Sequence, residues 1–312
     1  MAQDSEKRSI LVTSALPYAN APLHLGHILE HTQTDIWVRF QKLYGNECTY
    51  VCADDAHGTP IMLKAEELSM SPEELIEMVY KEHKRTFEDF NISHDNYHST
   101  HSNENKILSE RIYKALHAKG LIEKKVINQL FDTSRNMFLS DRYVKGTCPN
   151  CGAEDQYGDN CEKCSATYNA IDLKDPISVL TGTEPIIKES EHLFFKLSLL
   201  KDEINEWLDS SKIQEPVRNK LNEWLDADLK DWDISRDGPY FGFKIPGYDD
   251  KYFYVWLDAP FGYLASHLNY LIKQDCEKDF ESFWSKDSVS EVFHFIGKDI
   301  ICLLYTSDAA DE

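Results

Sequence analysis

The chain has 312 residues, which at roughly 150 residues per domain predicts about two domains, and 42% of the residues are hydrophobic, enough to bury a sizeable core. Its 33 basic and 54 acidic residues give a net charge of −21. This charge repels nucleic acid at long range and excludes a general DNA binder, so any RNA contact must be local and shape-specific. Apolar runs of about 18 residues are absent and the polar start lacks a signal-peptide core, so we expect a cytoplasmic protein without a membrane partner.

Residues 9–31 predict a strand, a turn and the start of a helix. The strand is the apolar run Ile10–Val12, and the turn after it holds two prolines, an asparagine and the pair His24 and His27. Free N–H groups and the positive end of the helix dipole at such a turn favour a bound phosphate. The helix is predicted from apolar residues at helical spacing that end before Gly45, namely Leu29, Thr32, Ile36, Trp37, Phe40, Leu43 and Tyr44.

Further elements follow in chain order. Residues 47–53 predict a second strand, with Asp54 and Asp55 at its carboxyl end, where ligands bind in parallel α/β sheets. Adjacent acids in a turn can also do no more than cap a helix, and for Asp54 that alternative stays open. The capping pattern from Ser71 to Glu74 predicts a helix to about residue 90, and another is expected from near residue 102 to 119.

From residue 121 the pattern changes to short strands. We expect strands at 125–131, 135–142 and 192–197, and helical segments around Trp207 and Trp224. The aromatic run 252–263 predicts a strand. An aromatic run is more often core than ligand pocket when no other signal accompanies it.

Four of the eight cysteines form two C-x2-C pairs separated by nine residues: Cys148, Cys151, Cys161 and Cys164. Two such turns can aim four thiolates at one tetrahedral centre, so we expect one structural zinc ion per chain. Two disulfides are the alternative, which a reducing cytoplasm disfavours. The other cysteines are expected to be small buried apolar residues: Cys48, Cys52, Cys276 and Cys302.

The strings Pro17-Tyr-Ala-Asn20 and His24-Leu-Gly-His27 resemble the first nucleotide-binding signature of class I aminoacyl-tRNA synthetases, in the form of the methionyl-tRNA synthetases. Residues 52–59, 232–243, 252–263 and 294–300 also resemble that family, so the resemblance covers roughly 8–301. It implies a doubly wound, parallel, Rossmann-like sheet interrupted by a connective insertion. The expected divisions are a first catalytic half at 8–120, the insertion at 121–235 with its zinc knuckle at 146–167, a second half at 236–301, and a non-matching tail at 302–312.

The resemblance also implies a site. His24, Gly26 and His27 would be catalytic and would bind ATP together with Gly297, Lys298 and Asp299. Methionine would be bound by Asp55, which takes its ammonium group, and by Leu16, Tyr18, Arg236, Trp256, Ala259, Pro260, Tyr263 and Ile300. Aromatic rings around a thioether form favourable sulfur–aromatic contacts.

The implied reaction is activation of L-methionine by ATP, with Mg²⁺, to methionyl-adenylate, followed by transfer to tRNA(Met). Past Ile301 the family has a histidine where this chain has Leu304, and the Lys-Met-Ser-Lys-Ser signature is absent. Residues 305–312 resemble nothing in the family. We therefore expect a truncated piece that lacks the anticodon-binding domain.

Two other hypotheses stay open. His27-Ile-Leu-Glu30-His31 has the H-x-x-E-H spacing of an inverted zinc-protease motif, although a match of five residues is weak. In the synthetase interpretation His31 only lines the surface of the first helix. The third hypothesis is a catalytically inactive nucleotide- or tRNA-binding module with the same fold.

Overall fold

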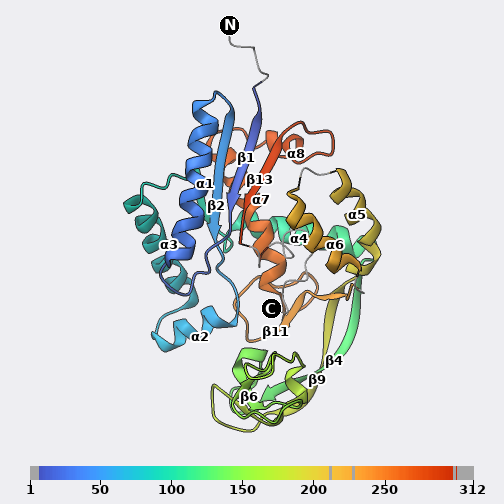
Figure 1. The fold of residues 1–312 in the computed structure, drawn as a ribbon. Helices are drawn as coiled ribbons and strands as arrows, with labels where there is room; N and C mark the ends of the chain where they lie inside the picture. Colours follow the sequence, from blue (N-terminus) through green and yellow to red (C-terminus); the bar gives the residue numbers. More distant parts are fainter. Residues whose placement is uncertain (1–6, 211–212, 227–228, 298–299, 301–312) are drawn as a thin grey trace.

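The computed structural model describes residues 7–210, 213–226, 229–297 and 300. Its centre is a four-stranded sheet in the order β13-β1-β2-β3, in which every pairing is parallel (Figure 1). The strands are β1 (Ser9–Ser14), β2 (Glu47–Asp54), β3 (Asn96–Ser99) and β13 (Glu291–Phe295). Two halves of the chain far apart in sequence therefore build one sheet, since β13 pairs with β1.

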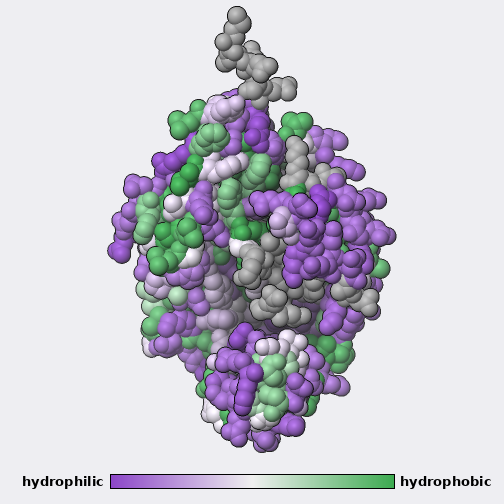
Figure 2. Space-filling model, viewed as in Figure 1, coloured by the Kyte–Doolittle hydropathy of each residue, from purple (hydrophilic) through white to green (hydrophobic). Residues whose placement is uncertain are grey.

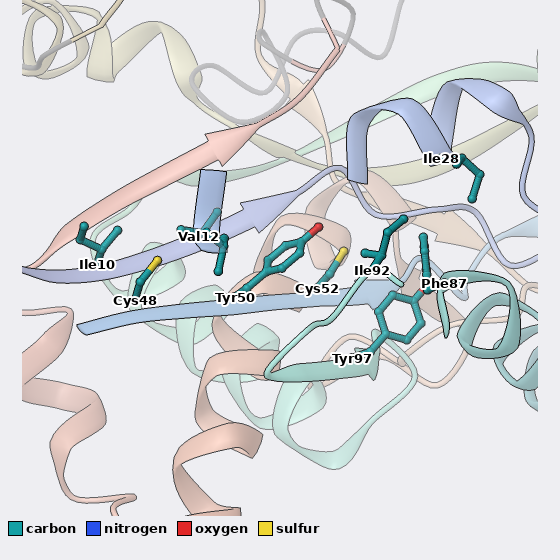
Figure 3. Close-up of a cluster of buried hydrophobic side chains, with 10 residues drawn as sticks. Ile10, Val12, Ile28, Cys48, Tyr50, Cys52, Phe87, Ile92 and Tyr97 are labelled. Carbon is teal, nitrogen blue, oxygen red and sulfur yellow. The ribbon is translucent and has the colours of Figure 1, made fainter. Parts of the chain in front are cut away.

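Helices cover both faces of this sheet. α1 (Leu25–Leu43) and α3 (Pro72–Asp89) bury side chains against one face, where Ile28, Phe87 and Tyr50 belong to one apolar cluster (Figure 3). α7 (Val255–Lys273) packs on the other face against β2 and β3, and α4 (Asn103–Ala118) packs on α7. This arrangement confirms the predicted doubly wound parallel fold.

The insertion is built around two long antiparallel strands, β4 (Ile122–Asp132) and β9 (Ile186–Phe195), flanked by β5 (Met137–Phe138) and β10 (Trp232–Asp233). These strands extend away from the central sheet and carry the cysteine-bearing unit at their far end (Figure 1). That unit contains β6 (Val144–Thr147), β7 (Gln156–Tyr157) and β8 (Lys174–Ser178). The strand predicted at 135–142 shrinks to β5, because a 3-10 turn at Asp141–Tyr143 follows it.

The remaining elements connect these parts. α2 (Thr59–Glu67) follows β2, and α5 (Lys201–Ser210) and α6 (Glu215–Asp226) follow β9, as the sequence predicts around Trp207 and Trp224. β11 (Ser235–Asp237) and β12 (Lys251–Phe253) form a small hairpin before α7, and α8 (Asp279–Phe283) precedes β13. In the described part of the chain, no helix is long and apolar enough to cross a membrane.

The prediction of a strand over 252–263 is wrong. β12 ends at Phe253, and α7 begins at Val255, so Trp256, Ala259, Pro260 and Tyr263 lie on a helix. α7 is enclosed between the central sheet and α4. Burial on two sides favours an apolar helix there and outweighs the strand preference of the aromatic residues at its start.

The apolar residues that predicted α1 by their spacing do not form its buried face. Leu29, Ile36 and Phe40 are exposed, whereas the buried face holds Ile28, His31, Thr34, Asp35, Val38 and Gln41. Figure 2 shows hydrophobic residues at the edge of the molecule where α1 lies. His31 is fully buried, so it does not line the helix surface as predicted. Polar side chains can occupy a core face when neighbours from the sheet satisfy their hydrogen bonds, as here.

Candidate active site

The turn after β1 is fastened to the end of β2 by backbone hydrogen bonds. The Asp55 amide donates to the Pro17 carbonyl at 2.8 Å, and the Ala19 amide donates to the Asp55 carbonyl at 2.8 Å. Tyr18 and Asp55 thus form an isolated parallel bridge beyond the strand ends. The fold therefore places the predicted ammonium ligand beside the predicted nucleotide-binding turn, at the carboxyl edge of the sheet.

His24 and His27 are organised around the first turn of α1. Nδ1 of His24 accepts from the backbone amides of Gly26, at 3.0 Å, and His27, at 3.4 Å, while Nδ1 of His27 accepts from the His24 amide at 3.3 Å. The two rings stack with centroids 3.7 Å apart. Since both Nδ1 atoms accept, each neutral ring carries its proton on Nε2. The helix start therefore offers two N–H donors, one from each ring.

Gly26 makes this arrangement possible. A Cβ atom at residue 26 would lie 2.8 Å from Cε1 of His24, so any side chain would displace that ring. Burial, followed by the neighbouring His24 and His83, lowers the pKa of His27 to about 4. At neutral pH His27 is therefore uncharged and can bind a phosphate oxygen by donating a hydrogen bond.

His83 and Asp54 also hold the turn after β1 in place. His83 on α3 lies 2.8 Å from the Ala21 carbonyl through Nε2 and 2.7 Å from Oδ1 of Asp54 through Nδ1. Tyr97 donates a short hydrogen bond to the same Asp54 oxygen. Asp54 therefore acts through His83 on the backbone that leads to His24, rather than capping a helix.

Asp55 has an unsatisfied carboxylate. Its Oδ1 is buried and has no hydrogen-bond partner within the protein. Burial first, and then the nearby carboxyl of Asp258, raise the pKa of Asp55 well above its usual value. A buried carboxyl of this kind is stabilised by a cation that donates hydrogen bonds, so the residue fits an ammonium ligand.

The structure adds a buried chain of polar side chains that the sequence did not single out. Nδ1 of His57 lies 2.5 Å from Oδ2 of Asp258, and its Nε2 lies 2.9 Å from Nδ1 of His101. The ring of His101 stacks on Phe241 at 5.0 Å. His57 follows Asp55 by two residues, but its partner lies 201 residues further along the chain, so only the tertiary fold reveals the pair.

Several predicted methionine-binding residues surround this edge. Leu16 lies close to α7, since a Cβ at Gly262 would be 3.3 Å from its Cδ1, and the fully buried Tyr263 follows on that helix. The hydroxyl of Tyr18 donates to the His57 carbonyl at 2.9 Å. Ala259 is buried and Pro260 is half-buried on α7. These contacts bring Leu16, Tyr18, Asp55 and the start of α7 together.

The other predicted residues make the following contacts. Trp256 packs on an apolar cluster that includes Phe253, Tyr113 of α4 and Leu193 of β9. Arg236 on β11 donates to Asp233 at 3.1 Å and lies 3.6 Å above the ring of Tyr254. Gly297 and Ile300 follow β13, joined by an amide–carbonyl bond of 3.1 Å. Lys298 and Asp299 fall outside the described residues, as do Cys302 and Leu304.

The four knuckle cysteines converge. Their sulfur atoms lie within 4.8 Å of one another, with Cys148 and Cys164 3.9 Å apart and Cys151 and Cys161 3.6 Å apart. Zinc–sulfur bonds of about 2.3 Å in a tetrahedron place sulfurs about 3.8 Å apart, whereas a disulfide needs about 2.05 Å. All four are free thiols, so the cluster fits a tetrahedral zinc site and not two disulfides.

The H-x-x-E-H spacing does not form a metal site. In the described residues two groups of three or more donors could share an ion, and His27 belongs to neither. Glu30 instead accepts from the Ala15 amide at 2.7 Å and so fastens α1 to the end of β1. The protease hypothesis therefore loses His27, one of the two histidines that its zinc ion would need.

An open groove of about 620 Å³ separates the signature turn from the insertion. It is lined by Asn20 of that turn, by α2, and by Arg135, Tyr143 and Leu180 of the insertion. Arg135 bridges the groove with a bidentate ion pair to Glu66 on α2, one arm of which measures 2.7 Å. The insertion therefore contacts α2 beside the turn that follows β1.

A doubly wound parallel sheet with a helix start of this kind at its carboxyl edge defines a nucleotide-binding α/β protein. The chain belongs to the family described as tRNA synthetases class I (M), whose family model matches residues 10–305. That match extends four residues past Ile301, where the resemblance noted in the sequence ends.

Solved structures agree with the family. The crystal structure of Mycobacterium tuberculosis methionyl-tRNA synthetase bound by methionyl-adenylate matches with a TM-score of 0.71 and 24% identity, over 97% of this chain and 54% of that chain. A second structure of the same enzyme in complex with methionyl-adenylate matches with a TM-score of 0.68 and 24% identity, over 96% and 53%. At this identity the likeness establishes the fold, and the chain spans about half the length of those proteins.

Proposed function

We propose that this chain activates L-methionine with ATP to form methionyl-adenylate, as part of a cytoplasmic methionine–tRNA ligase. The observation that carries the proposal is the bridge between Tyr18 and Asp55, which joins a two-histidine helix start to an unsatisfied buried carboxylate at one sheet edge. Groups that donate hydrogen bonds to phosphate thus lie beside a carboxylate that can bind an ammonium group. This arrangement suits the reaction of an amino acid with ATP.

In this proposal the carboxylate of methionine attacks the α-phosphorus of ATP, and pyrophosphate leaves. The Nε2–H groups of His24 and His27 donate to phosphate oxygens as negative charge develops there. Asp55 binds the ammonium group, which fixes the carboxylate for in-line attack. Mg²⁺ bound with ATP would supply positive charge that neutralises the pyrophosphate. Gly297, Lys298 and Asp299 are assigned to the nucleotide by resemblance.

The pocket for the methionine side chain is proposed from Leu16, Tyr18 and Tyr263, together with Trp256, Ala259, Pro260, Arg236 and Ile300. The zinc knuckle is proposed to hold one structural ion, because all four tetrahedral positions are filled by protein. The insertion, in contact with α2 beside the groove, is proposed to help place the acceptor end of tRNA(Met). The division into 8–120, 121–235 and 236–301 remains a prediction.

The direct test is to incubate the purified chain with ATP and each of a panel of amino acids and to detect the adenylate by chromatography. Methionyl-adenylate is the expected product. An adenylate formed only with another amino acid would overturn the substrate. Binding of ATP without any adenylate would favour the inactive binding module.

A further inference from the structure

Three metal-ligating side chains that the proposed reaction does not use meet behind the signature turn. They are His31 on α1, Cys52 on β2 and His94 in the loop before β3, and one donor atom of each lies within 4.8 Å of the other two. Nδ1 of His31 lies 3.1 Å from Nε2 of His94. His31 and Cys52 are fully buried and His94 is half-buried. Figure 3 shows Cys52 beside Tyr50 on the face of β2 that carries this apolar cluster.

We propose that His31, Cys52 and His94 bind a second zinc ion, separate from the four-cysteine knuckle. Zinc bonds of about 2.0–2.1 Å to nitrogen and about 2.3 Å to sulfur place two nitrogens about 3.3 Å apart in a tetrahedron. The 3.1 Å between the two imidazole nitrogens is close to that separation. A set of two imidazoles and one thiolate suits zinc better than the oxygen-seeking cations Mg²⁺ and Ca²⁺.

The surroundings supply what such a site needs. Nε2 of His31 lies 3.3 Å from the Ala15 carbonyl, so donation there leaves the Nδ1 lone pair facing His94. Oγ of Ser14 lies 3.2 Å from His31 Nδ1 and 3.5 Å from the sulfur of Cys52. This hydroxyl, itself 2.7 Å from that of Tyr50, is the fourth, oxygen ligand.

The proposed ion would have a structural role. Phe87 stacks on the ring of His31 at 4.4 Å and contacts that of His94 at 4.9 Å, so aromatic rings enclose the donors. The three ligands come from α1, β2 and the loop before β3, and one ion would tie these elements together. His31 lies one helical turn after His27, so the ion would fix the helix that presents the two histidines.

The test is the zinc content of the full chain carrying Cys148→Ser and Cys161→Ser, which removes the knuckle. One zinc per chain is expected to remain, and additional His94→Phe or Cys52→Ala should remove it. Two controls should keep it: Cys48→Ala, another buried cysteine on β2, and His27→Ala, the histidine of the H-x-x-E-H spacing that lies outside the cluster.

The site would be overturned if the knuckle variant lost all its zinc, or if it kept zinc after the additional Cys52→Ala substitution. The three side chains would then form only a network of hydrogen bonds. If those variants do not fold, cobalt titration of the unaltered chain decides. A second equivalent with the weaker charge-transfer absorption of one thiolate ligand supports the site, and saturation at one equivalent contradicts it. Neither measurement depends on the proposed enzymatic activity.

Discussion

His83 and Asp54 form a buried imidazole–carboxylate pair, with Nδ1 of His83 2.7 Å from Oδ1 of Asp54. The other ring nitrogen faces the Ala21 carbonyl at 2.8 Å. Both neighbours are acceptors, so the protonated ring satisfies both contacts. Burial lowers the pKa of His83, but its hydrogen bond and charge interaction with Asp54 and the Ala21 carbonyl outweigh burial, and the net shift is upward from 6.5.

Because the folded-state pKa of His83 is raised, its contribution to stability is complete below about pH 6.5 and is lost as the pH rises through the folded-state value. His83→Leu should remove this part of the pH dependence and lower the free energy of unfolding by about 2–4 kcal/mol at pH 6. Urea unfolding at pH 6 and pH 8.5 measures both effects. The control is His117→Leu, an exposed histidine on α4. Equal pH dependence in native and His83→Leu proteins would refute the role of the pair.

Replacing either signature histidine should slow adenylate formation and spare methionine binding. His24→Asn and His27→Asn each remove a donor to the phosphate as charge develops, which costs about 10²–10³ in kcat. Since the pKa of His27 is about 4, its contribution as a neutral donor should stay constant from pH 6 to pH 8. Single-turnover kinetics over that range, beside methionine titration, tests this. A parallel loss of methionine affinity would instead show that the turn had collapsed.

Asp55→Asn should weaken methionine binding by a factor of about 30 or more, because losing one partner of a buried, hydrogen-bonded charge pair costs about 2–5 kcal/mol. The sharper comparison uses a methionine analogue without its amino group. The native chain should discriminate strongly against that analogue, and the Asp55→Asn variant should not. Undiminished discrimination in the variant would mean that Asp55 does not contact the ammonium group.

Removing the knuckle metal should unfold the insertion locally. Cys151→Ser and Cys164→Ser leave two of the four thiolates, so the sheet of β6, β7 and β8 should lose amide protection while β1 and β2 keep theirs. Hydrogen exchange read by mass spectrometry resolves the two regions. Glu154→Ala, at an exposed position between Cys151 and Cys161 in the same knuckle, is the matched control. Unchanged protection of Val144–Thr147 in the cysteine variant would argue against a structural metal.

Local signals predicted much of the fold. The strand, turn and helix after Ser9, the capped helix after Ser71 and the knuckle cysteines each depend on residues close in sequence, and the structure confirms these elements. The resemblance implied one parallel sheet built from two halves of the chain, but the pairing of β13 with β1 required the structure, since nothing local at Glu291 specifies its partner.

The errors arose where tertiary burial decided the outcome. α1 presents Leu29 and Phe40 to the outside and buries His31 and Asp35, because β1, β2 and the loop between α3 and β3 provide hydrogen-bond partners for the polar face. The partnership of His57 with Asp258 spans 201 positions and has no local signature. For the predicted methionine pocket, the residue identities came from resemblance, while their placement on α7 required the structure.

The measurement that tests the central claim most directly is titration of the chain with a stable methionyl-adenylate analogue, compared with methionine and AMP alone. If the two histidines and Asp55 form one site, the linked ligand should bind at least about 100-fold more tightly than either part, because its second contact is intramolecular. Binding no tighter than that of the better part would contradict a single methionine-activating site at the carboxyl edge of the sheet.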